Sequence, residues 1–236
     1  PCRRPTDGRY GENPNRLQHY FQLQVILKPS PDEIQDLYIE SLASIGVHRN
    51  KNDIKFIDDN WESPSLGAAG VGWEVWLNGM EISQFTYFQQ IGGLDCNPVT
   101  GELTYGLERI AMHLQEVDNL YAVKWNNEIS YGEIYLQNEE ENSKYNFEFV
   151  EPKILIKFFE DMEAECIKLL ENDLPIPAYD ILLQNSHTLN LLDSKQAISS
   201  TERQAYILRL RKLSFLIAKK YLENREKINF PLMKNS

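Results

Sequence analysis

The sequence lacks the features that mark several large protein classes. Its 236 residues include only three cysteines, Cys2, Cys96 and Cys166, whose wide spacing matches neither a disulfide framework nor a zinc site. We therefore expect a reducing, cytoplasmic location. No apolar run reaches membrane-spanning length, so we expect no membrane partner. The four histidines show no metal-ligand spacing, and there is no P-loop, dinucleotide fingerprint or internal repeat.

Positive charge is also scarce, and it is unevenly placed. The chain has 24 Lys and Arg against 35 Asp and Glu, a net charge of -11, which excludes a general nucleic-acid binder. Residues 201–236, however, hold nine basic and three acidic residues, an excess of +6, so the remainder carries -17. This basic segment is either a partner-binding surface or an ordinary solvated helix face.

Residues 73–88 predict a β-hairpin, because two alternating runs flank Asn78-Gly79. Pairing residue 77 with residue 80 places residues 74, 76, 81 and 83 on one face of the sheet. Glu74 and Glu81 then lie on the same side, where two carboxylates repel each other unless a cation lies between them. Mg²⁺ accepts such oxygen ligands. On this pattern alone, the alternative of two unrelated surface glutamates remains open.

A second strand, residues 102–105, runs directly into a helix through Gly106, Leu107, Glu108 and Arg109. A helix N-terminus with an arginine in its first turn suits a phosphate polyanion. The alternative is that Glu108 and Arg109 form an ordinary pair on the helix surface. The helix is expected to bury a stripe consisting of Leu107, Ile110, Ala111, Leu114 and Val117.

The N-terminal region predicts a loop and then a strand. The loop is rich in proline, glycine and asparagine and carries Arg9 and Arg16. In the strand that follows, an apolar set alternates with a polar set. The apolar set is Phe21, Leu23, Val25 and Leu27, and the polar set is Tyr20, Gln22 and Gln24. The polar face fits the floor of a polar pocket, although a plain edge strand fits equally well.

The remaining elements complete an α+β pattern. A capping box at residues 30–33 predicts a helix to about residue 45, a strand covers 53–57, and residues 58–72 read as a loop. Residues 121–149 are polar, and their acidic run at 139–141 reads as a solvated loop. Helices follow from residue 151, with a stripe of Ile154, Phe158, Met162 and Cys166, then at about 178–191, and from a capping box at Ser199 and Glu202. We expect a catalytic domain at 1–150 and a helical region at 151–236.

Three segments together resemble the alpha subunit of the heterotetrameric glycyl-tRNA synthetase of bacteria. CRRPTDGRYGENPNRLQHYFQLQ (residues 2–24) resembles motif 2 of class II aminoacyl-tRNA synthetases, and LTYGLERIAMHL (103–114) resembles motif 3. WEVWLNGMEISQF (73–85) is similar to the strand pair that carries metal-binding acids in several class II enzymes. Motif 1, the dimer-forming helix and strand, is expected before motif 2, so we expect the printed sequence to begin after it.

The resemblance implies a class II synthetase catalytic fold, an antiparallel sheet flanked by helices, with a C-terminal helical appendage. It implies a glycine–tRNA ligase that makes glycyl-adenylate from ATP and glycine and then charges the 3′ end of tRNA(Gly). It also implies Mg²⁺ with ATP, an alpha homodimer, and a beta subunit in an assembly of two alpha and two beta chains. Such chemistry needs positioning and charge stabilisation rather than a protein nucleophile.

Roles for the motif 2 residues follow from the resemblance. Arg4 is expected to hold the α-phosphate, with Arg3 as the fallback, because a shift of one residue reverses the face of a strand. Arg16 is expected to hold the terminal phosphates. Tyr20 is expected to stack on adenine, with Phe21 as the alternative.

The other two segments supply the remaining ATP and metal contacts. Arg109 of motif 3 is expected near the γ-phosphate, next to Gly106. Glu74 and Glu81 are expected to bind Mg²⁺, with Gln84 nearby. Arg4, Arg109 and Glu81 are therefore the expected catalytic set.

Glycine is expected to meet a polar pocket and a bulky wall. The expected glycine contacts are Gln22, Gln24, Glu102 and Thr104, with Glu102 supplying the negative charge for the ammonium group. Because one methyl group is worth only about 1–3 kcal/mol of attraction, larger amino acids must be excluded sterically. The candidate wall residues are Trp61, Trp73 and Trp76.

Two other functions remain open at this point. One is a tRNA-independent adenylate-forming or amide-forming enzyme on the same scaffold, which would adenylate an acid but transfer nothing to tRNA. The other is a non-catalytic subunit that only binds a partner.

Overall fold

The computed structural model describes residues 1–231, which divide into two compact units. The first unit consists of Pro1–Trp61, Gly70–Phe88 and Asn97–Val150. The second consists of Glu62–Ala69, Gln89–Cys96 and the chain from Glu151 on. The second unit is therefore not purely C-terminal, because it includes the ends of strands whose middle parts belong to the first unit.

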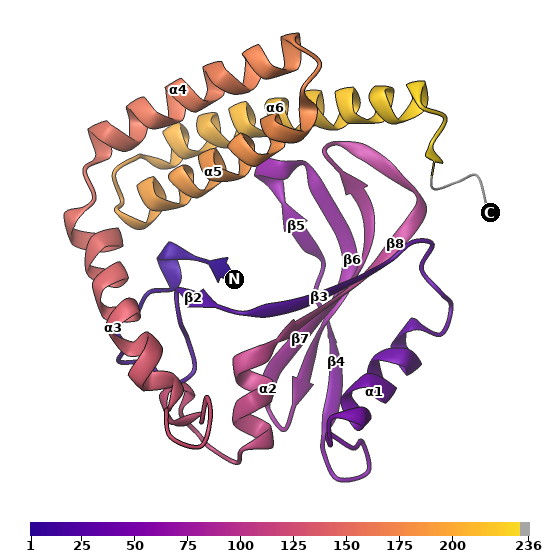
Figure 1. The fold of residues 1–236 in the computed structure, drawn as a ribbon, viewed down its shortest axis with the longest axis vertical. Coiled ribbons are helices and arrows are strands. Elements are labelled where there is room, and N and C mark those ends of the chain that lie inside the picture. The colour runs from indigo at the N-terminus through magenta and orange to yellow at the C-terminus, as the bar shows by residue number, and fades with distance from the viewer. Residues whose placement is uncertain (232–236) are drawn as a thin grey trace. The chain divides into compact units, whose positions relative to one another are not determined.

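An antiparallel sheet organises the first unit, as the α+β interpretation predicted. Its strands lie in the order β3, β8, β7, β6, β4, with β5 paired to β6, and Figure 1 labels them. Their bounds are β3 Gln22–Leu27, β4 Ile54–Asp58, β5 Trp61–Ser63, β6 Ala68–Leu77, β7 Met80–Ile91 and β8 Leu94–Gly106. A separate short pair joins β1 (Cys2–Arg3) to β2 (His19–Tyr20).

The turn between β6 and β7 confirms the hairpin prediction. Asn78 and Gly79 both have positive φ, 50° and 88°, as a type I′ turn requires. The Asn78 side chain also accepts the Asp53 N–H at 2.9 Å, which ties the turn to the start of β4. The predicted loop at 58–72 is wrong, however, because β5, the 3-10 turn Pro64–Leu66 and the start of β6 occupy it. Its glycines permit close strand packing, since a Cβ on Gly70 would lie 2.6 Å from the Tyr87 carbonyl oxygen.

Helix α1 (Ile34–Ser44) covers the apolar face of this sheet. The period of two in each strand sends alternate side chains to this face. The buried cluster consists of Ile34, Tyr38, Leu42, Val47, Val75, Leu77, Ile82, Phe85, Leu103, Tyr105 and Ile110. The predicted capping box at residue 30 is wrong. Ser30 is held elsewhere, because its N–H donates to the Val99 carbonyl and its hydroxyl to the Pro31 carbonyl.

Replacing Phe85 by alanine should lower the free energy of unfolding by about 3–5 kcal/mol, the usual effect of deleting a fully buried ring. The Phe85 side chain has no exposed surface, and its ring lies 4.9 Å from Tyr87 and 5.5 Å from Trp73. Urea denaturation measures the change. Val71→Ala, at a position that is 47% exposed on the neighbouring strand, should change stability by less than about 1 kcal/mol. Equal losses in the two variants would contradict this assignment of the core.

The segment after β8 forms helices that pack on one another. They are α2 (Leu107–Leu114), the 3-10 turn η3 (Leu120–Ala122), α3 (Tyr131–Lys144) and the π-helical turn Tyr145–Phe149. The solvated loop predicted for the acidic run 139–141 is therefore wrong, because α3 spans these residues after beginning at a capping box of Ser130 and Glu133. Within the acidic run, Glu139 is buried. The predicted stripe of α2 is also wrong at its ends, since Leu107 and Leu114 are exposed while Glu108 and Met112 are buried.

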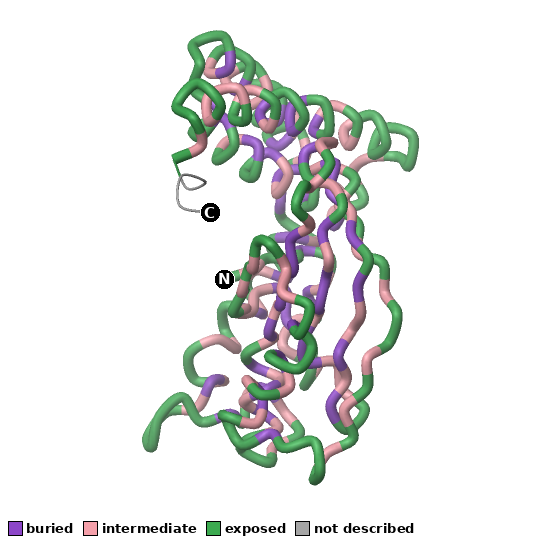
Figure 2. The backbone as a smooth tube through the Cα atoms, turned by 90° about the vertical axis from the view of Figure 1, so that its right-hand side faces the viewer, coloured by how far each residue is buried: buried purple, intermediate pink, exposed green. Residues whose placement is uncertain are grey.

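The second unit contains three long helices, namely α4 (Pro152–Glu171), α5 (Pro175–Ser194) and α6 (Ser200–Lys227). Their common core includes Phe159, Leu182 and Leu210, and Figure 2 marks the buried positions. The predicted capping box of Ser199 and Glu202 is confirmed. The predicted stripe of α4 is wrong by one residue for its first two positions: Ile154 and Phe158 are exposed, whereas Leu155 and Phe159 are buried.

Several basic side chains of α6 have partners within the same unit. Arg209 forms an ion pair with Glu163, and its guanidinium carbon lies 4.7 Å from the centroid of the Phe159 ring. Lys220 pairs with Asp173 at 3.1 Å. Part of the positive charge of this segment is therefore neutralised by acidic side chains of the same unit. Among residues 1–231, no helix is both long enough and apolar enough to cross a membrane.

Candidate functional site

A cavity of about 410 Å³ in the first unit collects many of the polar side chains. Among the described residues, its lining includes three arginines, Arg4, Arg16 and Arg109, and five carboxylates, Asp7, Asp59, Glu74, Glu81 and Glu108. The other lining residues are Asn15, Leu17, Tyr20, Gln22, Trp61, Ile82, Ser83, Gln84, Thr104, Gly106 and Leu120. They come from the N-terminal loop, six strands, the link before β5, the start of α2 and the turn η3, segments that lie far apart in the sequence.

The cavity brings together most of the residues that the sequence singled out. The lining contains Arg4, Arg16, Tyr20, Gln22, Glu74, Glu81, Gln84, Thr104, Gly106 and Arg109. Four others are not part of the lining: Arg3, Phe21, Gln24 and Glu102. Gln24 is exposed on β3, opposite Thr104. The chemical role of each residue stays a prediction.

The short β1–β2 pair positions Arg4 and Tyr20. Tyr20 pairs with Cys2, and the Arg4 N–H donates to the Gln18 carbonyl at 2.8 Å. The Arg4 guanidinium carbon then lies 5.4 Å from the centroid of the Tyr20 ring, within cation–π range. Burial raises the pKa of Tyr20 to about 12, so its phenol stays neutral near pH 7. Both arginines are exposed, but Arg3 pairs with His19 and does not line the cavity.

Phe21 lies outside the cavity and serves as a structural link. Its N–H donates to Glu108 Oε1 at 2.7 Å. Its ring packs against His19 and Tyr135, with centroids 5.5 and 5.7 Å apart. Between the two aromatic candidates, only Tyr20 contributes to the lining of the cavity.

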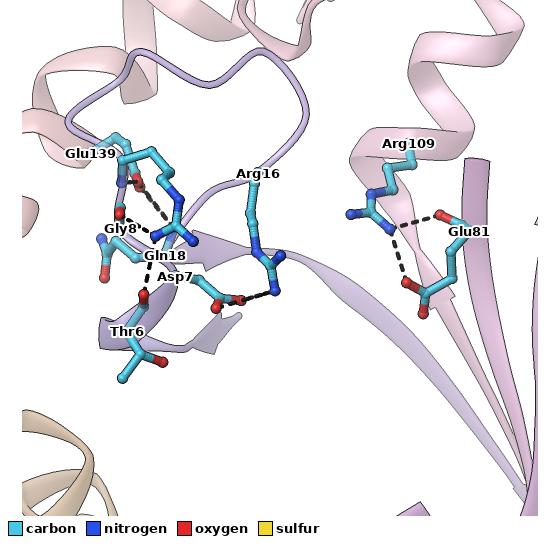
Figure 3. Close-up of polar contacts among 9 residues, drawn as sticks. Thr6, Asp7, Gly8, Arg16, Gln18, Glu81, Arg109 and Glu139 are labelled. Atoms are coloured by element: carbon cyan, nitrogen blue, oxygen red, sulfur yellow. Dashed lines mark hydrogen bonds and ion pairs between the residues drawn. The ribbon is translucent and has the colours of Figure 1, made fainter. Parts of the chain in front are cut away.

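Arg109 lies directly against Glu81 in the lining of the cavity. Its Nη1 donates to the Glu81 carbonyl oxygen at 2.9 Å and to Glu81 Oε2 at 3.1 Å (Figure 3). Both side chains are about one third exposed, at 32% and 36%. The main-chain bond fixes the guanidinium at one strand of the hairpin, so its position does not depend on the carboxylate alone.

Glu108 was missed as a functional candidate, and its reading as half of a surface pair is wrong. It is 8% exposed and accepts the Phe21 N–H and, at 2.9 Å, the Tyr131 hydroxyl. Burial raises the pKa of the Glu108 carboxyl, while these donors and its own backbone oppose the shift. The sequence around Glu108 does not indicate that its side chain is buried, because the partner Tyr131 belongs to another helix, α3.

Two further carboxylates in the lining were also missed. Asp59 accepts Gln84 Nε2 at 2.7 Å, and Asp7 lies 3.3 Å from Arg16 Nη2. Asp7 and Asp59 both lie in segments that the sequence predicted only as loops. Their effect is to give Arg16 and Gln84 definite partners at the cavity wall.

A model of the family described as glycyl-tRNA synthetase alpha subunit matches residues 1–226. The chain belongs to this family. It is therefore an aminoacyl-tRNA ligase of the glycine–tRNA ligase type, a translation enzyme. This membership confirms the resemblance and the class of fold, and it implies ATP, glycine, tRNA and a beta subunit as partners.

The carboxylates of the cavity fit a Mg²⁺ ion that arrives with ATP, as aminoacyl-tRNA synthetases generally use it. Within residues 1–231 there is no cluster of three His, Cys, Asp or Glu side chains that could hold a metal alone. Mg²⁺ often needs only one or two carboxylates besides phosphate oxygens and waters. Glu74 and Glu81 both line the cavity, and Trp76 Nε1 orients Glu74 by donating to its Oε2 at 2.8 Å.

The glycine candidates lie on neighbouring strands. Gln22 is opposite Gly106, and it accepts the Cys2 thiol at 3.0 Å. Thr104 lines the cavity, whereas Glu102 is half-buried two residues before it. Burial raises the pKa of Glu102, and a hydrogen bond with Thr104 opposes the shift.

Only one of the candidate wall tryptophans lines the cavity. Trp61 does so, and its ring lies 5.2 Å from Phe88 in an edge-on arrangement. Trp73 instead stacks on Phe85 in the core, and Trp76 bonds to Glu74. Trp61 is therefore the candidate that the geometry favours.

Replacing Glu108 by glutamine should change how stability depends on pH. Because burial raises the pKa of this carboxyl above its ordinary value of 4.5, the folded protein binds its proton more tightly than the unfolded chain does. Ionisation therefore lowers the stability of the wild type as pH rises from about 4.5 toward the raised pKa. The wild type should lose stability relative to Glu108→Gln over that interval. Urea denaturation from about pH 4.5 to about pH 7 measures this, and a difference that is independent of pH would contradict it.

Proposed function

We propose that this cavity is where ATP and glycine react to form glycyl-adenylate, before glycine is transferred to tRNA. One observation carries the proposal: the cavity lining combines Arg4, Arg16 and Arg109 with the acids Glu74 and Glu81. A triphosphate carries several negative charges and needs such a set of cations around it. Glu74 and Glu81 then serve the metal, and Glu102, two residues from Thr104, is proposed for the glycine ammonium group.

The reaction is an in-line attack of a glycine carboxylate oxygen on the α-phosphorus. A bond forms from that oxygen to phosphorus, the bond to the β-phosphate oxygen breaks, and pyrophosphate leaves. The guanidinium of Arg4 suits the α-phosphate, because its planar donors can follow the charge as it redistributes over the oxygens. Tyr20 offers an aromatic surface for adenine, and Arg16 and Arg109 hold the terminal phosphates.

Mg²⁺, held with ATP by Glu74 and Glu81, would neutralise part of the phosphate charge. In the structure, the two arginines proposed for the terminal phosphates are paired with carboxylates, Arg109 with Glu81 and Arg16 with Asp7. These ion pairs are partly exposed and therefore weak. Phosphate oxygens can replace the carboxylates as partners, which leaves Glu81 available as a metal ligand.

Trp61 is proposed as the wall that excludes larger amino acids. Trp61→Ala should allow alanine to be activated, because attraction through a methyl group discriminates by only about 1–3 kcal/mol. Amino-acid-dependent ATP–pyrophosphate exchange with alanine measures the change. Trp125→Ala, a control at a position that is 55% exposed and not in the lining, should still reject alanine. Unchanged rejection by Trp61→Ala would remove this residue from the wall.

The second step requires partners. We propose that the terminal ribose hydroxyl of tRNA(Gly) attacks the carbonyl carbon of the adenylate and releases AMP. A beta subunit supplies tRNA recognition, in an assembly of two alpha and two beta chains built on an alpha homodimer. No disulfide joins Cys2, Cys96 and Cys166, which suits a cytoplasmic location.

The deciding experiment is ATP–pyrophosphate exchange on the full-length chain, with and without the beta subunit. Exchange with glycine, but not with alanine or serine, is the expected result. No exchange in either condition, with folded protein and Mg²⁺ present, would refute adenylation in this cavity. Transfer of labelled glycine to tRNA separates a tRNA ligase from an enzyme that uses the adenylate for amide formation.

A further inference from the structure

The loop that carries Arg16 is fastened to α3 by one buried carboxylate. We call residues 5–18 the arginine loop. Glu139 of α3 accepts the Arg9 N–H at Oε1 (3.3 Å) and the Gln18 N–H at both oxygens, at 3.2 and 3.0 Å (Figure 3). One side chain therefore binds the loop at two points that are nine residues apart in the chain, on either side of Arg16.

This carboxylate lies well inside the protein. Glu139 is 2% exposed and Gln18 is 3% exposed. The partners of the carboxylate oxygens are peptide N–H groups, while the Arg9 guanidinium bends back onto the Thr6 and Gly8 carbonyls at 3.2 and 2.7 Å. Burying a carboxylate is unfavourable unless donors satisfy it. A buried carboxylate adds nothing to solubility, so the role of Glu139 is sought in the N–H groups that it accepts.

The rest of the contact shows that the loop backbone lies directly on α3 and the turn after it. The Tyr10 N–H donates to Ser143 Oγ at 3.1 Å. A Cβ on Gly8 would lie 2.8 Å from that same oxygen, and a Cβ on Gly11 would lie 2.5 Å from Leu136 Cδ1. The glycines thus permit a separation that side chains would forbid.

We propose that Glu139 is a positioning residue for ATP, which holds the arginine loop closed against α3 so that Asn15 and Arg16 stand at the cavity. Residues 9 and 18 are fixed, so the intervening segment has far fewer conformations than a free loop. Without the clamp, ATP would have to order this segment when it binds, and its apparent affinity would fall. The role toward ATP rests on the proposed function, whereas the fastening of the arginine loop to α3 does not depend on it.

Limited digestion with trypsin tests the clamp without any activity assay. The arginine loop contains two cleavable bonds, after Arg9 and after Arg16, whereas the bond after Arg4 precedes proline. In the full chain, Glu139→Ala should increase the cleavage rate in the loop by about tenfold or more, because the buried Gln18 N–H and the partly buried Arg9 N–H lose their acceptor. Glu139→Gln keeps one acceptor oxygen and should fall between Ala and wild type. Glu141→Ala, which removes an exposed carboxylate from the same helix, should cleave like wild type.

Kinetics of glycine-dependent ATP–pyrophosphate exchange then separate positioning from general damage. In Glu139→Ala the KM for ATP should rise by about tenfold, while kcat at saturating ATP changes by less than about threefold and KM for glycine stays near wild type. A uniform loss of active protein would lower kcat and leave both KM values unchanged. That result, or loop cleavage at the wild-type rate, overturns the proposal.

Two safeguards keep the outcomes distinct. If Glu139→Ala does not fold, Glu139→Gln and Ser143→Ala decide the question, and wild-type cleavage in both overturns the clamp. If the wild type shows no exchange with glycine, the proposed function fails while the trypsin comparison still reports on the loop. Faster cleavage with unchanged KM for ATP would leave a loop clamp but refute its role toward ATP.

Discussion

Arg109→Ala is expected to lower glycine-dependent ATP–pyrophosphate exchange by about 100-fold to 1,000-fold, the usual effect of removing a preorganised donor from developing charge. The structure supplies the preorganisation: the Glu81 carbonyl oxygen accepts Arg109 Nη1 at 2.9 Å, a main-chain contact that does not depend on the Glu81 carboxylate. The guanidinium therefore needs little reorganisation when phosphate arrives. Arg49→Ala, at an exposed position outside the lining, serves as the control and should change the rate by less than about twofold.

A double-mutant cycle with Glu81→Gln sharpens this prediction. Each single variant should be slow, because one loses a phosphate contact and the other a metal ligand. Residues that act on the same phosphates are coupled, so the double variant should lose less than the product of the two single effects. Strict multiplication would show that the two side chains act independently. Exchange by Arg109→Ala within about twofold of wild type would mean that our active-site assignment is wrong.

Arg4→Ala is expected to lower the same exchange rate by about 100-fold or more, because Arg4 would contact the phosphorus at which bonds form and break. Arg4→Lys keeps the positive charge but loses the planar fork and its fit to Tyr20, so it should recover only a small part of the rate. The loss should appear mainly in kcat. Exchange kinetics at varied ATP, with circular dichroism as the check on folding, measure it.

The neighbouring residue provides a matched control for this prediction. Arg3→Ala removes the same side chain from an exposed position that pairs with His19 and does not line the cavity. It should change the exchange rate by less than about threefold. A larger effect from Arg3 than from Arg4 would reverse the assignment and make Arg3 the α-phosphate contact.

Features that depend on neighbouring residues could be predicted from the sequence. The β6–β7 hairpin follows from Asn78 and Gly79, because only residues that tolerate positive φ form such a turn. The turn then sets the strand register, and the hydrogen bond from Trp76 to Glu74 confirms that these two side chains share a face. The start of α6 follows in the same way from Ser199 and Glu202, which are three residues apart.

Local patterns failed where a distant segment decided the environment. The apolar stripe of α4 contains more candidates than the core accepts, and packing against α5 and α6 buried Phe159 rather than Phe158. The capping box predicted at Ser30 does not form, because the Ser30 N–H donates to the Val99 carbonyl of β8. Neither partner is visible from within the helix itself.

The sequence by itself determined the family, the order of the three motifs, the hairpin and most of the residues that line the cavity, because turn chemistry and strand periodicity are local. Only the tertiary structure decided that Tyr20, rather than Phe21, lines the cavity and that Glu108 and Glu139 are buried. The physical reason is that a carboxylate can be buried only where donors meet it. For Glu139 those donors lie 121 and 130 residues away, in a loop that reaches α3 only in the folded chain.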